Sequence, residues 1–173
     1  MANAVFDTIR TLLAVREYQD KPVPDDIVRR VVESGRLSAS ASNKQPWHFV
    51  VIRDRNTLRE VGPMSQTGPY ITQANFAVAV AVEKGNPLAV SDGSRAIQDM
   101  MLTAWEDGVG SNWVGFAGGR LGPIARKLGI PESYDLLAIV PFGYPKRQLG
   151  KGKKNRKALS EVASAEKFGQ PFK

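Results

Sequence analysis

The chain has 173 residues, a formal net charge of +7, no cysteine and a single histidine. Without cysteine, disulfides, thiolate nucleophiles and sulfur-ligated metals are excluded, and one histidine excludes a multi-histidine metal centre. Any redox chemistry must therefore come from an organic cofactor. The length of the chain predicts one domain, residues 1–173, with a substantial core.

No apolar run reaches the roughly 18 residues of a membrane span, and the first residues lack the basic and hydrophobic regions of a signal peptide. We therefore expect a cytoplasmic protein without membrane contact. The positive charge indicates anionic partners but does not specify them. The basic cluster between residues 146 and 157 contains glycines but no stacking aromatics, so a solvated segment is expected there rather than a nucleic-acid site.

The first half of the chain predicts two helices, a loop and a strand. Apolar spacing predicts a helix over 5–13, and Pro22 and Pro24 then indicate an extended linker. A second helix is expected from Asp25, where a proline and two acids favour a helix start. A polar loop over 38–45 precedes the β-branched run 49–52, which we interpret as a short buried strand, and 54–61 predicts a short helix before an irregular loop over 62–69.

The second half predicts the centre of the sheet. Residues 75–82 form an uncharged run of small and β-branched residues, which is typical of a central strand. A long helix is expected over 92–107, ended by Gly108 and Gly110. A short strand at 111–116, a glycine-rich turn at 117–119, a helix through Leu128 and a buried strand at 136–140 follow, and the stretch 146–173 predicts an extended arm.

The loop over 38–45 is crowded with small, hydroxyl-bearing and amide-bearing residues. Its backbone N–H groups are unobstructed, and its Ser, Asn and Gln side chains both donate and accept hydrogen bonds, as the edge of a flat heterocycle requires. The alternative is an ordinary polar turn between a helix and a strand, and composition alone favours that alternative.

Five stretches in order resemble the nitroreductase family of flavoproteins, and the resemblance covers nearly the whole chain. Each alone is weakly specific, but their joint order and spacing are specific. They are Ala14-Val15-Arg16-Glu17-Tyr18, residues 40–47 ending in Asn-x-Gln-Pro-Trp, residues 108–115, Phe142-Gly143-Tyr144-Pro145, and Lys154-Asn155-Arg156.

The resemblance implies an α+β, nitroreductase-like fold with a central mixed or antiparallel sheet flanked by helices. It further implies a homodimer that holds FMN at its interface, with residues 146–173 as a basic C-terminal arm exchanged between subunits. The loop over 40–45 would come from one subunit, and the remaining contacts from the other. The implied cofactor-binding residues are Ala14, Arg16, Ala39, Ser40, Asn43, Gln45, Val114, Gly115, Lys154 and Arg156.

The chemistry of these residues suits the parts of FMN that the resemblance assigns to them. Lys154 and Arg156, two apart in an extended segment, would bind the phosphate. Arg16 would stabilise the negative charge of the reduced flavin, and Gly115 would allow a backbone N–H to approach flavin N5. Taken singly, each has a plainer interpretation: Arg16 as a surface ion-pair partner, Gly115 as a turn residue, and the two cations as part of the solvated cluster.

The chain departs from the family pattern at one place. Family members usually carry Arg-Arg-Ser or a similar polar triplet before the position of Arg16, where this chain has Leu12, Leu13 and Ala14. Because the first arginine of the triplet reaches the phosphate, we expect FMN binding to be about ten- to a hundredfold weaker than with the full set.

The resemblance implies an FMN-dependent oxidoreductase that uses NAD(P)H to reduce a nitroaromatic, a quinone or a similar small electron acceptor by ping-pong transfer. No catalytic side chain and no metal are expected; Phe116 and Tyr70 are candidates to stack on substrate, although such residues are more often core. The alternatives are a flavin storage or sensor protein with little turnover, or dehalogenation or flavin fragmentation, for which no insertion suggests the necessary lid.

Overall fold

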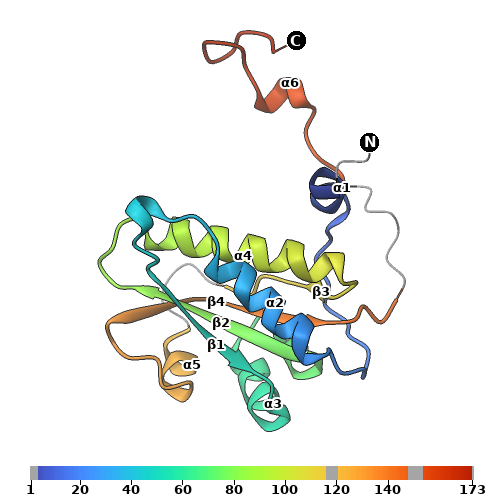
Figure 1. The fold of residues 1–173 in the computed structure, drawn as a ribbon, viewed down its shortest axis with the longest axis vertical. Helices are drawn as coiled ribbons and strands as arrows, with labels where there is room; N and C mark the ends of the chain where they lie inside the picture. The colour runs from blue at the N-terminus through green and yellow to red at the C-terminus, as the bar shows by residue number, and fades with distance from the viewer. Residues whose placement is uncertain (1–3, 116–120, 148–153, 173) are drawn as a thin grey trace.

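A four-stranded antiparallel sheet in the order β1-β2-β4-β3 forms the centre of the protein (Figure 1). The computed structural model describes residues 4–115, 121–147 and 154–172. The strands are β1 (Trp47–Ile52), β2 (Phe76–Glu83), β3 (Gly110–Ser111) and β4 (Tyr134–Gly143). The helices are α1 (Ala4–Thr11), α2 (Asp25–Arg36), α3 (Arg55–Met64), α4 (Ala89–Glu106), α5 (Gly122–Lys127) and α6 (Leu159–Val162), with short 3-10 turns η1 (Ala41–Asn43) and η2 (Pro69–Gln73).

The central strand β2 separates two hydrophobic layers. Side chains alternate across a strand, and Val78, Val80 and Val82 pack with α2 and α4 on one face. Ala77 and Ala79 pack on the other face with residues of α3, η2 and α5. Both faces are covered, which explains the uncharged run and confirms the predicted central strand and the α+β fold.

Four sequence expectations need correction. The run 49–52 is not a fully buried strand: β1 is an edge of the sheet, and Val51 is 39% exposed. Proline does not end the last strand, because β4 continues through Pro141. Pro141 pairs with Ala77 of β2 on one side, and on the other side the two-residue β3 pairs only with Phe142 and Gly143. Helix α3 extends into the expected loop as far as Met64, and α4 begins at Ala89 rather than at residue 92. The glycine-rich turn at 117–119, Phe116 and residues 148–153 of the arm lie outside the described residues.

Asp54 caps the N-terminus of α3. Its Oδ1 accepts hydrogen bonds from the backbone N–H and the hydroxyl of Thr57, both at 2.8 Å. These bonds, the backbone one first, lower the pKa of the Asp54 carboxyl from its ordinary value. A lowered carboxyl pKa means that the stabilisation is present above the unfolded-state pKa and is lost as pH falls through the folded-state pKa.

We therefore expect Asp54→Ala to lower the melting temperature near neutral pH, and the difference from the wild type to shrink at about pH 3. Thermal unfolding at the two pH values tests this. Asp54→Asn is the control, because its amide oxygen still accepts from Thr57 whatever the pH. A deficit for Asp54→Ala that is the same at both pH values would contradict the assignment.

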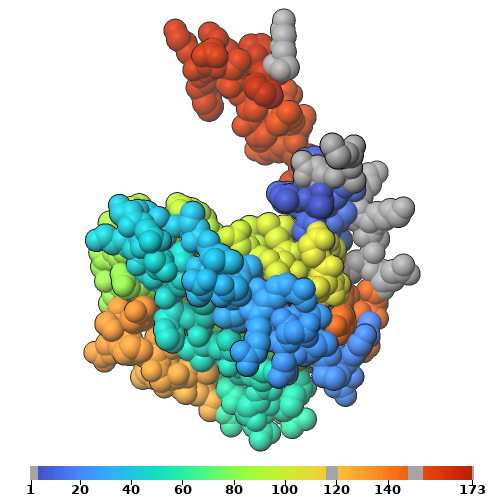
Figure 2. All heavy atoms as spheres, viewed as in Figure 1, coloured from blue at the N-terminus to red at the C-terminus, as the bar shows by residue number. Residues whose placement is uncertain are grey.

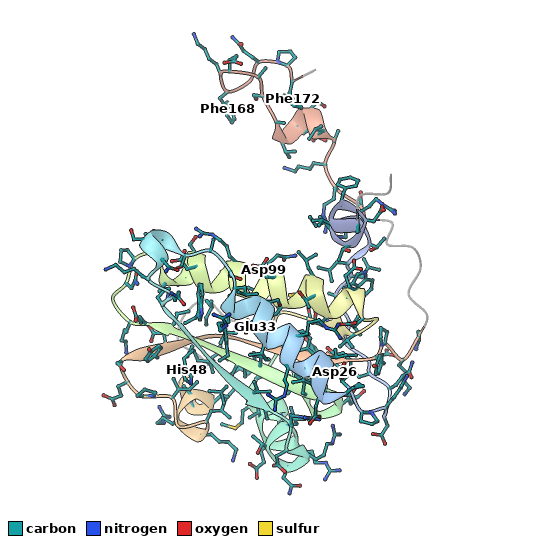
Figure 3. All side chains as sticks on the ribbon, viewed as in Figure 1. Asp26, Glu33, His48, Asp99, Phe168 and Phe172 are labelled. Carbon is teal, nitrogen blue, oxygen red and sulfur yellow. The ribbon has the colours of Figure 1, made fainter. Side chains whose placement is uncertain are left out.

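The described end of the arm, residues 154–172, extends away from the sheet beside α1 (Figures 1 and 2). It exposes large apolar side chains, and so does α1, where Val5 and Phe6 are 67% and 60% exposed. An apolar groove of about 490 Å³ lies between α1, α2 and α4. The exposed apolar residues of the arm are Leu159, Val162, Phe168 and Phe172, the last two labelled in Figure 3.

Candidate functional site

The loop over 38–45 adopts a compact, strained conformation. Ser42, Asn43 and Gln45 have φ angles of 50°, 54° and 51°, in the left-handed region that non-glycine residues seldom adopt. Ser40 Oγ accepts a hydrogen bond from the Gln45 backbone N–H at 2.9 Å. The Gln45 side-chain amide donates to Asn43 Oδ1 at 3.2 Å, so the two amide side chains predicted to meet a heterocycle lie together and are exposed.

Three charged residues of helix α4 bond to this loop. The hydroxyl of Ser38 donates to Asp99 Oδ2. Arg95 Nη1 donates to the carbonyl oxygen of Ala39 at 3.3 Å. The backbone N–H of Ala41 donates to Asp92 Oδ2 at 3.1 Å. Sequence reasoning missed Asp92, Arg95 and Asp99; the available signal was their spacing, which places charges on one face of a helix that is otherwise largely apolar.

The segment that carries Ala14 and Arg16 is fixed along the opposite edge of the sheet. The Val15 N–H donates to the carbonyl oxygen of Ser111 at 2.8 Å, and the Gln19 N–H donates to that of Tyr144 at 2.8 Å. The buried Tyr18 hydroxyl donates to the Val15 carbonyl oxygen at 2.8 Å. Burial raises the pKa of Tyr18, the nearby Tyr70 phenol raises it further, and the Arg16 charge partly opposes them.

Arg16 is exposed between these anchors. Across residues 4–115, 121–147 and 154–172, it forms no ion pair with a carboxylate. The interpretation of Arg16 as a surface ion-pair partner therefore has no support within this part of the chain. An exposed guanidinium with no carboxylate partner among the described residues suits an anionic ligand.

Val114 and Gly115 lie further along β4, away from this segment. Val114 exchanges backbone hydrogen bonds with Ile139, at 3.0 and 2.8 Å. The neighbouring Asn112 side-chain amide donates to the Tyr70 hydroxyl, and Tyr70 packs against the cluster of Val15, Tyr18 and Ala74. A Cβ at Gly115 would lie 2.4 Å from Trp113 Nε1 and 3.1 Å from the Leu137 carbonyl oxygen, so a larger residue here would displace the Trp113 ring. This packing supplies a reason for Gly115 that the sequence did not reveal, and the predicted approach to flavin N5 stays a prediction.

The arm places its two predicted phosphate ligands near the end of α1. Lys154 Nζ donates to the carbonyl oxygen of Ile9 at 2.5 Å. Desolvation first, and then the charge of Arg156, lower the pKa of the Lys154 ammonium from its ordinary value. The Arg156 guanidinium is exposed and, among the residues that the structure describes, donates only to the carbonyl oxygen of Asn155, at 2.9 Å. Two neighbouring cations of this kind, one of them partly desolvated, fit a phosphate dianion.

Eight of the ten predicted residues form two groups rather than one site. The loop with Ala39, Ser40, Asn43 and Gln45 meets the first turns of α4 at Asp92. The group with Ala14, Arg16, Lys154 and Arg156 lies towards the last turn, where Trp105 Nε1 donates to Thr11 Oγ1 at 3.0 Å. Val114 and Gly115 belong to neither group, because they lie along β4 at Ile139 and Leu137. Asp92 and Trp105 are about 20 Å apart along the helix, at 1.5 Å per residue. The two groups of one chain are therefore too distant to contact the same ring system.

The donor set fits FMN in kind. One group offers paired amide side chains for a heterocycle, and the other offers three cations for a phosphate and a reduced ring. Within the described ranges, no cluster of three or more metal-ligating side chains occurs. None of the helices drawn in Figure 1 is long and apolar enough to span a membrane.

The fold is α+β, and two separate groups of residues have donors that suit a phosphorylated heterocycle. We call these groups half-sites: the loop over 38–45 is one, and the group with Arg16, Lys154 and Arg156 is the other. The sequence profile of the Nitroreductase family matches residues 13–83 and 67–144. The chain belongs to the nitroreductase family.

Individual proteins of similar sequence or structure support this assignment to the family. A Methanothermobacter thermautotrophicus protein named "Putative NADH dehydrogenase/NAD(P)H nitroreductase" is 31% identical over 152 residues, which cover 84% of this chain and 80% of that protein. A crystal structure of a Bacteroides thetaiotaomicron protein of the same name is 25% identical, covers 98% of this chain and 99% of its own, and has a TM-score of 0.88. An FMN-dependent nitroreductase from Clostridium difficile is 20% identical, covers 94% and 99% of the two chains, and shares the fold with a TM-score of 0.87.

Proposed function

We propose that this protein is an FMN-dependent NAD(P)H oxidoreductase that works as a homodimer. The observation that carries the proposal is the separation of the two half-sites at opposite ends of α4. Each half-site suits a different part of FMN, and a second copy of the chain can bring the loop of one subunit to the cations of the other. The names of the archaeal relative and of the clostridial structure support the reductant and the cofactor.

The residues of the two half-sites would divide the work of binding. Asn43 and Gln45 would exchange their mutual hydrogen bond for bonds to the pyrimidine edge, supported by Ser40 and the Ala39 backbone. Arg16 of the other subunit would hold a positive charge beside the ring, stabilising the reduced form. Lys154 and Arg156 would bind the phosphate, and the three donors of a lysine ammonium allow Lys154 to keep its bond to Ile9.

Bound FMN would supply two-electron chemistry, accepting hydride from NAD(P)H at N5 and reducing a small electron-poor acceptor, such as a nitroaromatic or a quinone, in ping-pong order. None of the side chains at either half-site needs to act as an acid or a base. Ala14, Val114 and Gly115 would contribute backbone groups, and Tyr70, whose hydroxyl accepts from the Asn112 amide, is a candidate to stack on a planar acceptor. Because NAD(P)H is an intracellular reductant, we place the activity in the cytoplasm.

Absorbance spectroscopy of the purified protein tests the proposal. We expect flavin bands to appear on addition of FMN, to bleach under anaerobic NADH or NADPH, and to return on addition of a quinone or a nitroaromatic. The reductant that bleaches the bands identifies the donor, and parallel lines in initial-rate plots identify ping-pong transfer. A protein that takes up no FMN would contradict the proposal.

A second candidate function is flavin storage or sensing with little turnover. The observation that favours it is the triplet Leu12, Leu13 and Ala14, which removes a phosphate cation and a hydroxyl from the family pattern. FMN that binds but is not reduced by either nicotinamide would support this candidate.

Leu12→Arg should restore one phosphate contact. Leu12 follows α1 directly, and its N–H donates to the carbonyl oxygen of Thr8 at 2.9 Å, close to the turn whose Ile9 carbonyl holds Lys154. We expect the dissociation constant for FMN to fall about tenfold, since a charged hydrogen bond contributes about 1.5–3 kcal/mol. Fluorescence quenching of FMN measures it. Leu13→Arg is the control with the same added charge, and equal tightening by both variants would show a general charge effect instead.

A further inference from the structure

We propose that Asp92, Arg95 and Asp99 are positioning residues that hold the loop over 38–45 in its ligand-ready form. This inference rests on the proposed function, because it assigns the loop to the flavin. None of the three side chains would touch the flavin; each acts on the loop backbone or on its first residue.

The three residues make successive contacts along one face of α4. Their spacing of three and four positions brings them to the same side of the helix. From the helix start, Asp92 accepts from the Ala41 N–H at 3.1 Å and Arg95 donates to the Ala39 carbonyl oxygen at 3.3 Å. Asp99, labelled in Figure 3, accepts from the Ser38 hydroxyl. The loop is therefore fixed at three of four consecutive residues.

We call these three contacts of α4 with the loop the clamp. Two of its residues, Asp92 and Arg95, also interact with each other. The Asp92 side chain is 1% exposed, and Arg95 Nη1 lies 3.0 Å from its Oδ1 as an ion pair, without the alignment of a hydrogen bond. A buried carboxylate is costly unless its charge is compensated. Arg95 therefore has two tasks, because it compensates Asp92 and at the same time holds Ala39. Its other terminal nitrogen donates to Ser91 Oγ at 3.2 Å, which fixes the guanidinium on the helix.

The clamp is placed where the loop needs external support. Left-handed backbone at Ser42, Asn43 and Gln45 persists only if the surroundings determine it. The three clamped residues come directly before the strained ones, and they fix the direction in which the chain enters the turn. A loop held in this way before the ligand arrives does not have to be ordered on binding, so the clamp should tighten FMN binding through preorganisation.

The experiment separates loop order from flavin binding. Arg95→Met removes the Ala39 contact and the counter-charge, whereas Asp92→Asn keeps an oxygen that can accept from the Ala41 N–H and removes the charge. Arg95→Lys keeps the charge but lacks the second terminal nitrogen, which bonds Ser91 Oγ and fixes the guanidinium on the helix. Arg30→Met is the matched control: Arg30 pairs with the half-buried Asp107 after α4, at 3.3 Å, away from the loop. Amide hydrogen exchange is measured on FMN-free protein, and FMN affinity by fluorescence quenching.

We expect Arg95→Met to accelerate exchange at Ala41 and Asn43 while the amides of β2 stay as slow as in the wild type, and to weaken FMN binding about tenfold. Asp92→Asn and Arg95→Lys should show smaller changes of both quantities, and Arg30→Met none. Unchanged loop exchange in Arg95→Met, or acceleration that includes β2, would overturn the inference. If the wild type takes up no FMN, the proposed function fails, and the exchange data alone decide whether the clamp exists.

Discussion

Replacing both Lys154 and Arg156 by glutamine is expected to weaken FMN binding by about a hundredfold or more. Each would make a charge-assisted hydrogen bond to the phosphate, worth about 1.5–3 kcal/mol, and the wild-type chain already lacks the cation usual at Leu12. Riboflavin, which has no phosphate, should bind the variant and the wild type equally. Titration of both flavins, followed by fluorescence, gives the two ratios.

The control for this prediction removes the same charge elsewhere. Arg29 and Arg59 are exposed on α2 and α3, and replacing both by glutamine should leave the affinity for FMN near that of the wild type. If riboflavin binding falls as much as FMN binding in the arm variant, the two residues support the arm rather than the phosphate, and their assignment is wrong.

Substituting serine for both Phe168 and Phe172 is expected to convert a dimer into monomers that do not retain FMN. Both aromatic rings are exposed in a single chain, at the far end of an arm that extends from the body (Figure 3). We infer that they cover the apolar groove between α1, α2 and α4 of the other subunit, where Val5, Leu37 and Leu102 form part of the lining. Because a buried phenylalanine contributes about 1.5–3 kcal/mol, losing two should raise the dimer dissociation constant about a hundredfold or more.

Sedimentation velocity over a range of protein concentrations measures this constant, and absorbance in the same cell reports bound flavin. The variant should keep the far-ultraviolet circular dichroism of the wild type, because the two rings do not contribute to the core of their own chain. Val51→Ser, which removes an exposed apolar side chain from the edge strand β1, should leave the assembly unchanged. A variant that stays dimeric at wild-type strength would show that the arm does not join the subunits.

The sequence predicted the central strand of the sheet correctly, but it did not show which strand lies at the edge of the sheet or where the last strand ends. The run 75–82 could be assigned to a central strand because only a strand covered on both faces is apolar throughout. The run 49–52 looks similar, but whether a strand is central or at an edge depends on partners far away in the chain. Pro141 was misleading for the same reason: proline is tolerated where a neighbouring strand is absent, and the shortness of β3 could not be seen locally.

The sequence predicted candidate site residues, but it could not predict which residues support them. The composition of 38–45 favours a plain turn, and only the joint order of five stretches assigned it to a flavin. The clamp on α4 could not be predicted, because it depends on how α4 is rotated against the loop, which the packing of the whole core decides. Gly115 shows a related limit: its nearest constraint is Trp113, two residues away, and that contact exists only because of the local path of the chain.

The placement of the two half-sites at opposite ends of α4 has a genetic consequence. In the proposed homodimer, a variant damaged at Asn43 and another damaged at Arg16 would each be inactive alone, since every site would contain the lesion. In a mixed dimer, both lesions fall in the same site, and the other site is assembled entirely from undamaged parts. Co-expression of two inactive alleles should therefore restore activity, whereas two alleles damaged in the same half-site should not complement each other.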